Sequence, residues 1–314
     1  MLEKERLIKE LLKKGYSKKD GTKSWDISKR EFRYLNKDMA KSFLRLTEHP
    51  RYKATIIDIE IDLIKKNVES LLGNKITKKS FNLINMGCVG GSKANAVISK
   101  LSKDFKIRYC PVNVNEDLVK LSLKEVKSKK HINVVDYHPV VSEDFDSLDI
   151  VSGSLRNSKY QRNIILLLGS LISSFDINDY LFKVSQSMFP GDYLVIGNGI
   201  RKGERFTKLE TYKHPLFNDW LIHLMRLLDF KDDEVEYGVR FTNERLEGFY
   251  NIKVNKTFTL NGDSLDFNKG DEIIVAQQRK FFEDELKKIC EDYFEDVHLV
   301  KDKDEEYCLI FCKR

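Results

Sequence analysis

The sequence predicts an α/β fold in which parallel strands alternate with helices. Apolar runs with strand character, the first at residues 81–86, are separated by stretches with helical spacing. A glycine-rich turn follows the first run directly. The run at residues 164–168 is apolar throughout, which is typical of a central strand buried on both faces. Because strands that alternate with helices are joined by right-handed crossovers, the sheet is predicted to be parallel.

The chain begins with segments of helical periodicity and then changes to alternating strands and helices. Helices are expected first over residues 2–14, 28–47 and 55–72. Strands are then expected over residues 81–86, 106–112, 132–135, 163–168 and 193–196. The helices between them are expected over residues 92–101, 116–126 and 178–187. Asn115 is a plausible N-cap of the second of these helices.

The pattern changes again after residue 200. A helix is expected over residues 215–228, and short alternating runs follow to residue 267, with the hairpin signal Asn261-Gly262 between two of them. A strand at 271–276, a helix at 280–293 and a strand at 307–312 end the chain. The sequence therefore predicts three parts, which are a helical N-terminal cap over 1–75, a Rossmann-like core over 76–200, and a helix with a smaller antiparallel β insertion over 201–314 that returns to the main sheet.

Composition limits the class of protein. The 314 residues carry a formal net charge of +6, with 55 Lys and Arg against 49 Asp and Glu, and this mild excess is dispersed. A nucleic-acid partner is not expected, because such proteins concentrate their basic charge. The five cysteines show no CxxC spacing, the scattered histidines show no metal-ligand spacing, and no metal is predicted. Without a signal peptide or a long apolar stretch, we expect a cytoplasmic protein without a membrane partner.

The turn Gly87-Cys88-Val89-Gly90-Gly91 lies between the first predicted strand and its helix. Glycine lets backbone approach a ligand closely, and the start of the helix would present free amide groups. The turn is neither GxGxxG nor a Walker motif. Nucleotide binding and a purely structural tight turn are both open at this point.

Two further sites carry side chains suited to a nucleoside. Asn113 ends the second strand, where a residue normally holds ribose hydroxyls, although it can equally shape the turn. Asp144 and Phe145 would present a carboxylate to an adenine amino group beside an aromatic wall. The alternative is that Asp144 is a surface carboxylate in an acidic loop.

Several motifs in a fixed order resemble one family. The similar stretches are Asn85–Lys93, Tyr109–Val114, Leu168–Ser174, Pro190–Gly197, Phe217-Asn218 and Gly270–Phe281. Together they resemble the histidine Nα-methyltransferase family of the ergothioneine pathway, and the chain looks like a divergent member. The resemblance implies a class I methyltransferase sheet, S-adenosylmethionine as cofactor and a small-molecule substrate.

The resemblance also implies roles for individual residues. The residues that it implies for cofactor binding are Tyr52, Gly87, Cys88, Lys93, Asn113, Asp144 and Phe145. The residues that it implies for substrate binding are Tyr34, Gly169, Ser174, Tyr212 and Gln278. Gly87 and Lys93 would contact the methionine part of the cofactor, and Tyr212 would hold the substrate. No residue is expected to form a covalent intermediate.

The sequence also departs from the family pattern. The acidic residues that end the family's first and second strands are Asn85 and Asn113 here, and a substrate-binding asparagine is replaced by Ser174. The glutamate and serine that read the imidazole ring align with Ala276 and Gln278. Loss of a carboxylate that pairs with a buried polar ring typically costs ~1–3 kcal/mol. The departures therefore disfavour histidine as the substrate.

Two other functions stay open. A catalytically inactive relative would keep the fold and act as a binding or partner protein. A methyltransferase acting on RNA or protein would use the lysine-rich segment at residues 9–23, although a solvated helix face explains these lysines better.

Overall fold

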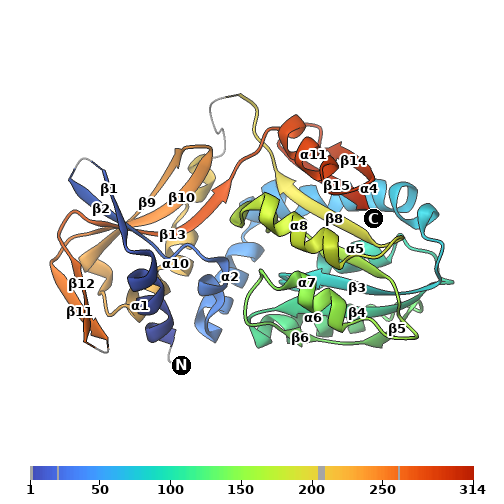
Figure 1. Cartoon of the computed structure of the whole chain (residues 1–314), viewed down its shortest axis with the longest axis horizontal. Helices are drawn as coiled ribbons and strands as arrows, with labels where there is room; N and C mark the ends of the chain where they lie inside the picture. The colour runs from blue at the N-terminus through green and yellow to red at the C-terminus, as the bar shows by residue number, and fades with distance from the viewer. Residues whose placement is uncertain (1–2, 20, 204–208, 261) are drawn as a thin grey trace. The chain divides into compact units, whose positions relative to one another are not determined.

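The computed structural model describes residues 3–19, 21–203, 209–260 and 262–314. The chain forms two compact units. The first, which we call the core unit, comprises His49–Arg205 and Lys280–Arg314. The second unit comprises Met1–Glu48 and Phe206–Arg279. Figure 1 shows the elements of both units in the colours of the chain.

The core unit is built on a mostly parallel sheet with the strand order β14-β15-β8-β7-β3-β4-β5, and β6 also pairs with β4. Its strands are β3 (Ser80–Met86), β4 (Lys106–Asn113), β5 (Val134–Tyr137), β6 (Val140–Val141), β7 (Asn163–Leu167), β8 (Tyr193–Gly199), β14 (Asp296–Lys301) and β15 (Tyr307–Lys313). The pairs β14–β15 and β15–β8 are antiparallel, and the other described pairs of this sheet are parallel. The predicted α/β, Rossmann-like fold is therefore confirmed.

The order of the strands reverses between β3 and β7. From β3 the chain proceeds to β4 and β5 on one side, and then returns to β7 and β8 on the other. Open parallel sheets bind ligands beyond the carboxyl ends of the strands at such a reversal. The turn after β3 lies at this point, because β3 ends at Met86.

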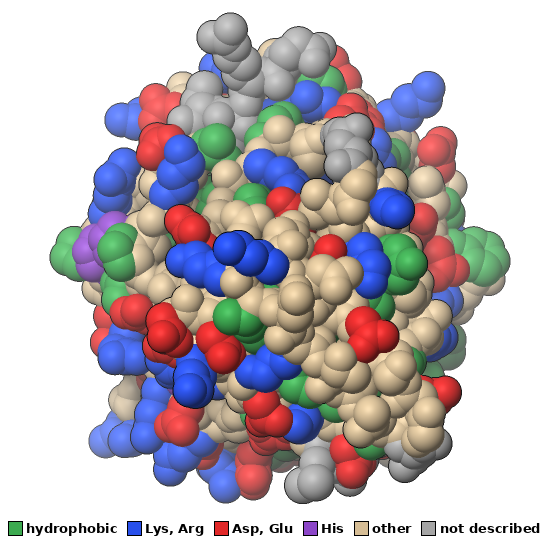
Figure 2. Space-filling view, turned by 90° about the vertical axis from the view of Figure 1, so that its left-hand side faces the viewer, with side chains coloured by type: hydrophobic (Ala, Val, Ile, Leu, Met, Phe, Trp, Pro, Cys, Tyr) green, Lys and Arg blue, Asp and Glu red, His purple; other side chains and the backbone are tan. Residues whose placement is uncertain are grey.

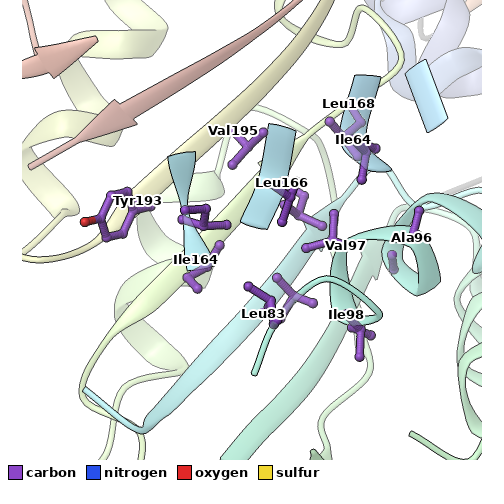
Figure 3. Close-up of a cluster of buried hydrophobic side chains, with 14 of the residues drawn as sticks. Ile64, Leu83, Ala96, Val97, Ile98, Ile164, Leu166, Leu168, Tyr193 and Val195 are labelled. Atoms are coloured by element: carbon purple, nitrogen blue, oxygen red, sulfur yellow. The ribbon is translucent and has the colours of Figure 1, made fainter. Parts of the chain in front are cut away.

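Helices cover both faces of this sheet. The helices on one face are α4 (Asp58–Leu71), α5 (Ser92–Ile98) and α6 (Glu116–Ser128), and those on the other are α7 (Leu148–Ser154), α8 (Ile177–Ser187) and α11 (Glu283–Glu291). Figure 3 shows Ile64 and Val97 from the first group together with Leu83, Leu166 and Val195 of the strands. Full burial of each such aliphatic side chain stabilises the fold by ~1.5–3 kcal/mol.

The second unit contains a smaller sheet with the order β1-β2-β13-β10-β9. Its strands are β1 (Tyr16–Lys19), β2 (Thr22–Asp26), β9 (Val235–Thr242), β10 (Arg245–Ile252) and β13 (Glu272–Arg279), and a separate hairpin is formed by β11 (Lys256–Leu260) and β12 (Asp263–Phe267). Its helices are α1 (Glu3–Lys14), α2 (Lys37–Glu48), α9 (Leu209–Tyr212) and α10 (Pro215–Leu227), with 3-10 turns η1 (Arg30–Tyr34) and η5 (Asp232–Glu234). The antiparallel pairs β9–β10, β10–β13 and β11–β12 confirm the predicted β insertion.

The structure divides the chain differently from the predicted three parts. The predicted cap over residues 1–75 is split at residue 48, because α4 packs Leu63, Ile64 and Val68 onto the main sheet and belongs to the core unit. The segment before α4 forms α3 (Pro50–Tyr52) and a π-helical turn, η2 (Lys53–Ile57). Two short 3-10 turns, η3 (Gly73–Lys75) and η4 (Ile172–Ser174), complete the core unit's described elements.

Two features of the strands were not predicted. The first is the hairpin of β1 and β2, which pairs Tyr16 with Trp25, while β2 also pairs in parallel with β13. Strand β14 also went unpredicted. Asn261 of the predicted hairpin turn lies outside the described residues, although Leu260 and Asp263 on either side of that turn pair as expected. Among the described residues, every helix is too short or too polar to cross a membrane.

Candidate functional site

The turn after β3 has a backbone that only glycine adopts readily. Gly87 and Gly90 have φ angles of +68° and +73°, in the left-handed region. A Cβ atom at Gly87 would lie 3.0 Å from Cδ2 of Leu171 and 3.8 Å from Cε1 of Phe145. In the first half of the turn, the Gly87 backbone therefore lies directly beside two apolar side chains, with no side chain of its own between them.

The second half of the turn is packed against α6. The Gly91 amide donates a hydrogen bond of 2.6 Å to Oε2 of Glu125, and Ser122 Oγ donates one of 2.8 Å to the Gly90 carbonyl. A Cβ atom at Gly91 would lie 2.8 Å from Cβ of Glu125. The expectation of a free amide at the start of α5 is therefore wrong for Gly91, because Glu125 already uses its N–H group.

Cys88 and Asn113 join the ends of β3 and β4. The Asn113 amide nitrogen donates to the Cys88 carbonyl at 2.8 Å, and its oxygen accepts from the Asn115 amide at 3.0 Å. Asn113 is 0% exposed. Burial raises the pKa of the Cys88 thiol to about 12, so this thiol is neutral. These contacts favour the turn-shaping interpretation of Asn113, and a contact with ribose stays a prediction.

Asn85 takes part in a chain of neutral hydrogen bonds. Its Nδ2 donates to the Tyr109 hydroxyl at 3.0 Å, and that hydroxyl lies 2.7 Å from Ser122 Oγ. Burial holds the pKa of Tyr109 well above its usual value. The chain continues through Ser122 to the Gly90 carbonyl. Asn85 therefore supports the glycine turn without introducing a charge.

The loop that follows β6 brings Phe145 to the turn but uses part of Asp144 locally. Oδ1 of Asp144 accepts hydrogen bonds from the Ser147 amide at 2.9 Å and from its hydroxyl at 2.7 Å, just before α7. Phe145 is buried, with its ring edge against Gly87. The structure thus brings together the predicted aromatic wall and the predicted glycine turn.

Gly169 and Ser174 lie in the loop that follows β7, and the ammonium group of Lys93 approaches Gly169 from α5. Lys93 is the second residue of α5, and a Cβ atom at Gly169 would lie 3.2 Å from its Nζ. Gly169 follows β7 with a φ of +71°, and Ser170 has a φ of +58°, a strained value for a residue with a side chain. Ser174 lies in η4 of the same loop. Tyr52, in α3, is half-buried.

Sequence reasoning missed Glu60, which lies on the buried face of α4 and is 0% exposed. Its carboxylate pairs with Lys93 Nζ and accepts hydrogen bonds from the Gly169 amide at 2.9 Å and from the Tyr307 hydroxyl at 2.6 Å. The available signal was an acid at the spacing of the apolar residues Leu63 and Ile64.

Three predicted substrate residues belong to the second unit. Tyr34 is buried in an aromatic cluster, with ring centroids 5.3 Å from Phe43 and 5.7 Å from Trp220. Tyr212, in α9, is half-buried, and its carbonyl accepts a hydrogen bond of 3.3 Å from the Tyr237 hydroxyl. Gln278 lies in β13 opposite Leu246. Within this part of the chain, packing explains Tyr34 more fully than it explains Tyr212.

A metal centre is not apparent, because no group of three or more His, Cys, Asp or Glu side chains suited to a metal occurs among the described residues.

Similar solved structures include an S-adenosylmethionine-dependent methyltransferase from Clostridium acetobutylicum, with 12% identity, a TM-score of 0.47 and coverage of 87% of this chain and 98% of that one. They also include the CcbJ methyltransferase of Streptomyces caelestis, with 12% identity, a TM-score of 0.40 and coverage of 81% and 96%. The PH0226 protein of Pyrococcus horikoshii has 13% identity, a TM-score of 0.45 and coverage of 89% and 100%.

No curated protein sequence matches the chain. Residues 36–314 match the model of a family described as histidine-specific, S-adenosylmethionine-dependent methyltransferases. That range includes the sheet of the core unit, the glycine turn and the β insertion. The chain therefore belongs to the family of histidine-specific, S-adenosylmethionine-dependent methyltransferases.

Proposed function

We propose that this methyltransferase acts on a small amino-acid-like or amine substrate and that histidine is disfavoured as the methyl acceptor. The family match over residues 36–314 carries the reaction class. The acceptor is inferred from β13, where Ala276 and Gln278 stand opposite Gly248 and Leu246. None of these side chains carries a charge that would pair with an imidazole ring.

The residues of the core unit fit S-adenosylmethionine at its methionine end. The backbone at Gly87 and Gly169 is open to a ligand because these residues have no side chain. A Cβ atom would fill the space beside Leu171 at Gly87 and beside Lys93 at Gly169. Lys93 supplies a cation, with 23% of its side chain exposed, for a carboxylate. We assign this end to Gly87, Cys88, Lys93 and Tyr52, and the adenosine end to Phe145, Asp144 and Asn113.

When bound, S-adenosylmethionine supplies a methyl group on an electrophilic sulfonium. The protein would bind the acceptor, orient its neutral nitrogen and exclude water, so that the two reactants meet in line. Tyr212, Tyr34, Gly169, Ser174 and Gln278 are the residues proposed to hold the acceptor. Since no covalent intermediate is required, the proposal needs no nucleophilic side chain.

The first test is calorimetric titration of the full chain with S-adenosylmethionine and S-adenosylhomocysteine. We expect micromolar binding that is lost in Gly87→Trp, because the indole would collide with Leu171 and Phe145. Gly153→Ala is the matched control, since no atom lies within 4 Å of the added methyl group. Absence of binding by the wild-type chain at millimolar ligand would overturn the proposal.

Incubation with labelled S-adenosylmethionine and a panel of amino acids and amines then tests the acceptor. Transfer to a non-histidine amine supports the proposed substrate class. Preferred transfer to histidine would overturn the inference from Ala276 and Gln278. Tight cofactor binding without transfer to any acceptor would favour the inactive partner protein, for which the amides Asn85 and Asn113 in place of acids are the supporting observation.

We propose a cytoplasmic protein without a nucleic-acid partner. All five cysteines are buried free thiols, the state that a reducing compartment maintains. Figure 2 shows one face of the molecule, on which Lys and Arg side chains lie among Asp and Glu side chains. Binding to mixed RNA that weakens steeply with salt would contradict the absence of a nucleic-acid partner.

A further inference from the structure

Glu60 is a charged side chain held in the interior of the core unit. Its Oε1 accepts hydrogen bonds from the Gly169 amide at 2.9 Å and from the Tyr307 hydroxyl at 2.6 Å, while Oε2 pairs with Lys93. Burial and the neighbouring Glu60 carboxylate hold the pKa of Tyr307 well above its usual value, so Tyr307 stays a neutral donor. The carboxylate is therefore surrounded by donors from β15, α5 and the loop after β7.

The fold makes room for this carboxylate. A Cβ atom at Gly197 in β8 would overlap Oε1 of Glu60, so the glycine keeps that space open. A buried ion pair is weak evidence for stability, because well-packed apolar residues of similar volume often stabilise a core equally well. A carboxylate in this place is better explained by what it does to Lys93.

The Lys93 ammonium group lies beside both Glu60 and Gly169. Lys93 follows the glycine turn as the second residue of α5, and its ammonium group approaches Gly169 on one side. Its side chain remains 23% exposed while that of Glu60 is 0% exposed. An ammonium group has three N–H donors, so a bond to Glu60 leaves others to meet a ligand at the outer side.

We propose that Glu60 is a positioning residue that fixes the Lys93 ammonium, so that Lys93 meets the carboxylate of the methionine part of the cofactor. This inference rests on the proposed function. The lysine side chain alone is flexible, and a buried carboxylate that holds it in place lowers the entropy cost of each bond it makes. The charge of Glu60 acts only through Lys93 and touches no ligand atom.

The experiment compares two ligands on the full chain by calorimetry. S-adenosylhomocysteine carries the amino-acid carboxylate, whereas 5′-methylthioadenosine lacks it and keeps the adenosine and thioether. We expect Glu60→Gln to weaken the binding of S-adenosylhomocysteine by about tenfold, because the Lys93 ammonium would no longer be held in place for the ligand carboxylate. We expect the affinity for 5′-methylthioadenosine to stay within about twofold. A merely structural role would weaken both ligands alike.

Two further variants sharpen the comparison. Glu125→Gln is the matched control, because Glu125 bonds the Gly91 amide of the glycine turn, and this variant should not discriminate between the ligands. In a Lys93→Met background, Glu60→Gln should no longer change the ratio of the two affinities. Glu60→Asp keeps the carboxylate but shortens the side chain, which moves the carboxylate away from Lys93. It should give a smaller loss of S-adenosylhomocysteine affinity with the same selectivity, and it can be measured even if Glu60→Gln fails to fold.

The outcomes separate the two proposals. One outcome is that the wild-type chain binds S-adenosylhomocysteine, while Glu60→Gln and Glu60→Asp lower the affinities for both ligands equally or leave both unchanged. This outcome would overturn the positioning role and leave the proposed function standing. Failure of the wild-type chain to bind either ligand would overturn both. A selective loss of S-adenosylhomocysteine supports the positioning role.

Discussion

Among the glycines described in the core unit, Gly197 is the one where an added methyl group would be most crowded. Its Cβ would occupy the space of the Glu60 carboxylate. Gly197→Ala should therefore lower the free energy of unfolding by about 2–4 kcal/mol, through overpacking and loss of the buried ion pair. Urea denaturation measures this loss.

Gly153→Ala is the control for that variant, because Gly153 lies in α7 with open space around it. Alanine in an exposed helix interior should be neutral or stabilising by up to ~1 kcal/mol. Equal stability of the two variants would show that Glu60 moves aside at no cost, contrary to the expected result.

Two buried thiols predict how stability changes at high pH. Burial raises the pKa of Cys88 and Cys110 from 9.0 to about 12. Both thiols are protonated in the folded and unfolded states below pH 9. Between pH 9 and 12 the unfolded state releases these protons first, so each thiol should lower the free energy of unfolding by about 1.4 kcal/mol per pH unit. Urea midpoints from pH 8 to 11 measure the slope.

Cys88→Ala should make the dependence of the free energy of unfolding on pH less steep by about 1.4 kcal/mol per pH unit, the contribution of one thiol. This change in slope is expected whatever effect the substitution has on stability at neutral pH. An unchanged slope in this variant would contradict the assignment to Cys88.

At this scale the sequence identified residues whose chemistry is local. Gly87 was singled out from the turn motif and Lys93 from the family resemblance, their ligand contacts stay predictions, and the structure brings Phe145 to Gly87. The role of Asn113 was open, because an amide at a strand end can serve a ligand or its own turn, and only the bonds to Cys88 and Asn115 distinguish the two. Glu60 was missed, because its partners come from segments far away in the chain.

At the scale of elements, α6 depends on its first side chain. Asn115 accepts hydrogen bonds from the amides of Asp117 at 3.0 Å and Leu118 at 3.3 Å, as the sequence predicted for an N-cap. Asn115→Ala should lower the free energy of unfolding by ~1 kcal/mol, since these amides lose their partner. Asn115→Asp keeps the acceptor and should cost far less. A thermal melt of both variants tests this, and identical melts would argue against the cap.

Regular periodicity predicted most strands and helices of the core unit, whereas two pairings could not be predicted. Strand β14 has a weakly alternating, half-exposed sequence, and its partner is β15. The hairpin of β1 and β2 is lysine-rich, and its stability depends on the Tyr16–Trp25 contact and on the remote strand β13. Tertiary pairing overrides local propensity at both places.

At the scale of the whole molecule, the core unit holds all the strands of its sheet. Residues 206–279 belong to the second unit, and the core-unit segments on either side of them pair with each other. Ile200 forms a β-bridge with Phe281, and the Arg201 amide donates a hydrogen bond of 3.0 Å to the Phe281 carbonyl. A protein that begins at His49 and joins Gly203 to Lys280 by a short Gly-Ser linker should therefore fold and unfold cooperatively. Circular dichroism during urea denaturation tests this prediction.

The same protein ending at Lys280 serves as its control. It lacks β15, which pairs with β8 and contributes Leu309 and Phe311 to the core, and it should lose the cooperative transition. A broad, non-cooperative transition in the first protein would show that the core unit depends on the second unit.

The pairing of β2 with β13 has a consequence for the order of events during synthesis. The amide of Lys23 bonds to Asp271, 248 positions further along the chain, and the last strand, β15, completes the other sheet. The smaller sheet cannot close until β13 has left the ribosome, nor the main sheet until β15 has, and such remote pairings form slowly. The hairpin of β1 and β2 must therefore wait with an open edge, where charges such as that of Lys18 protect a strand from joining another nascent chain.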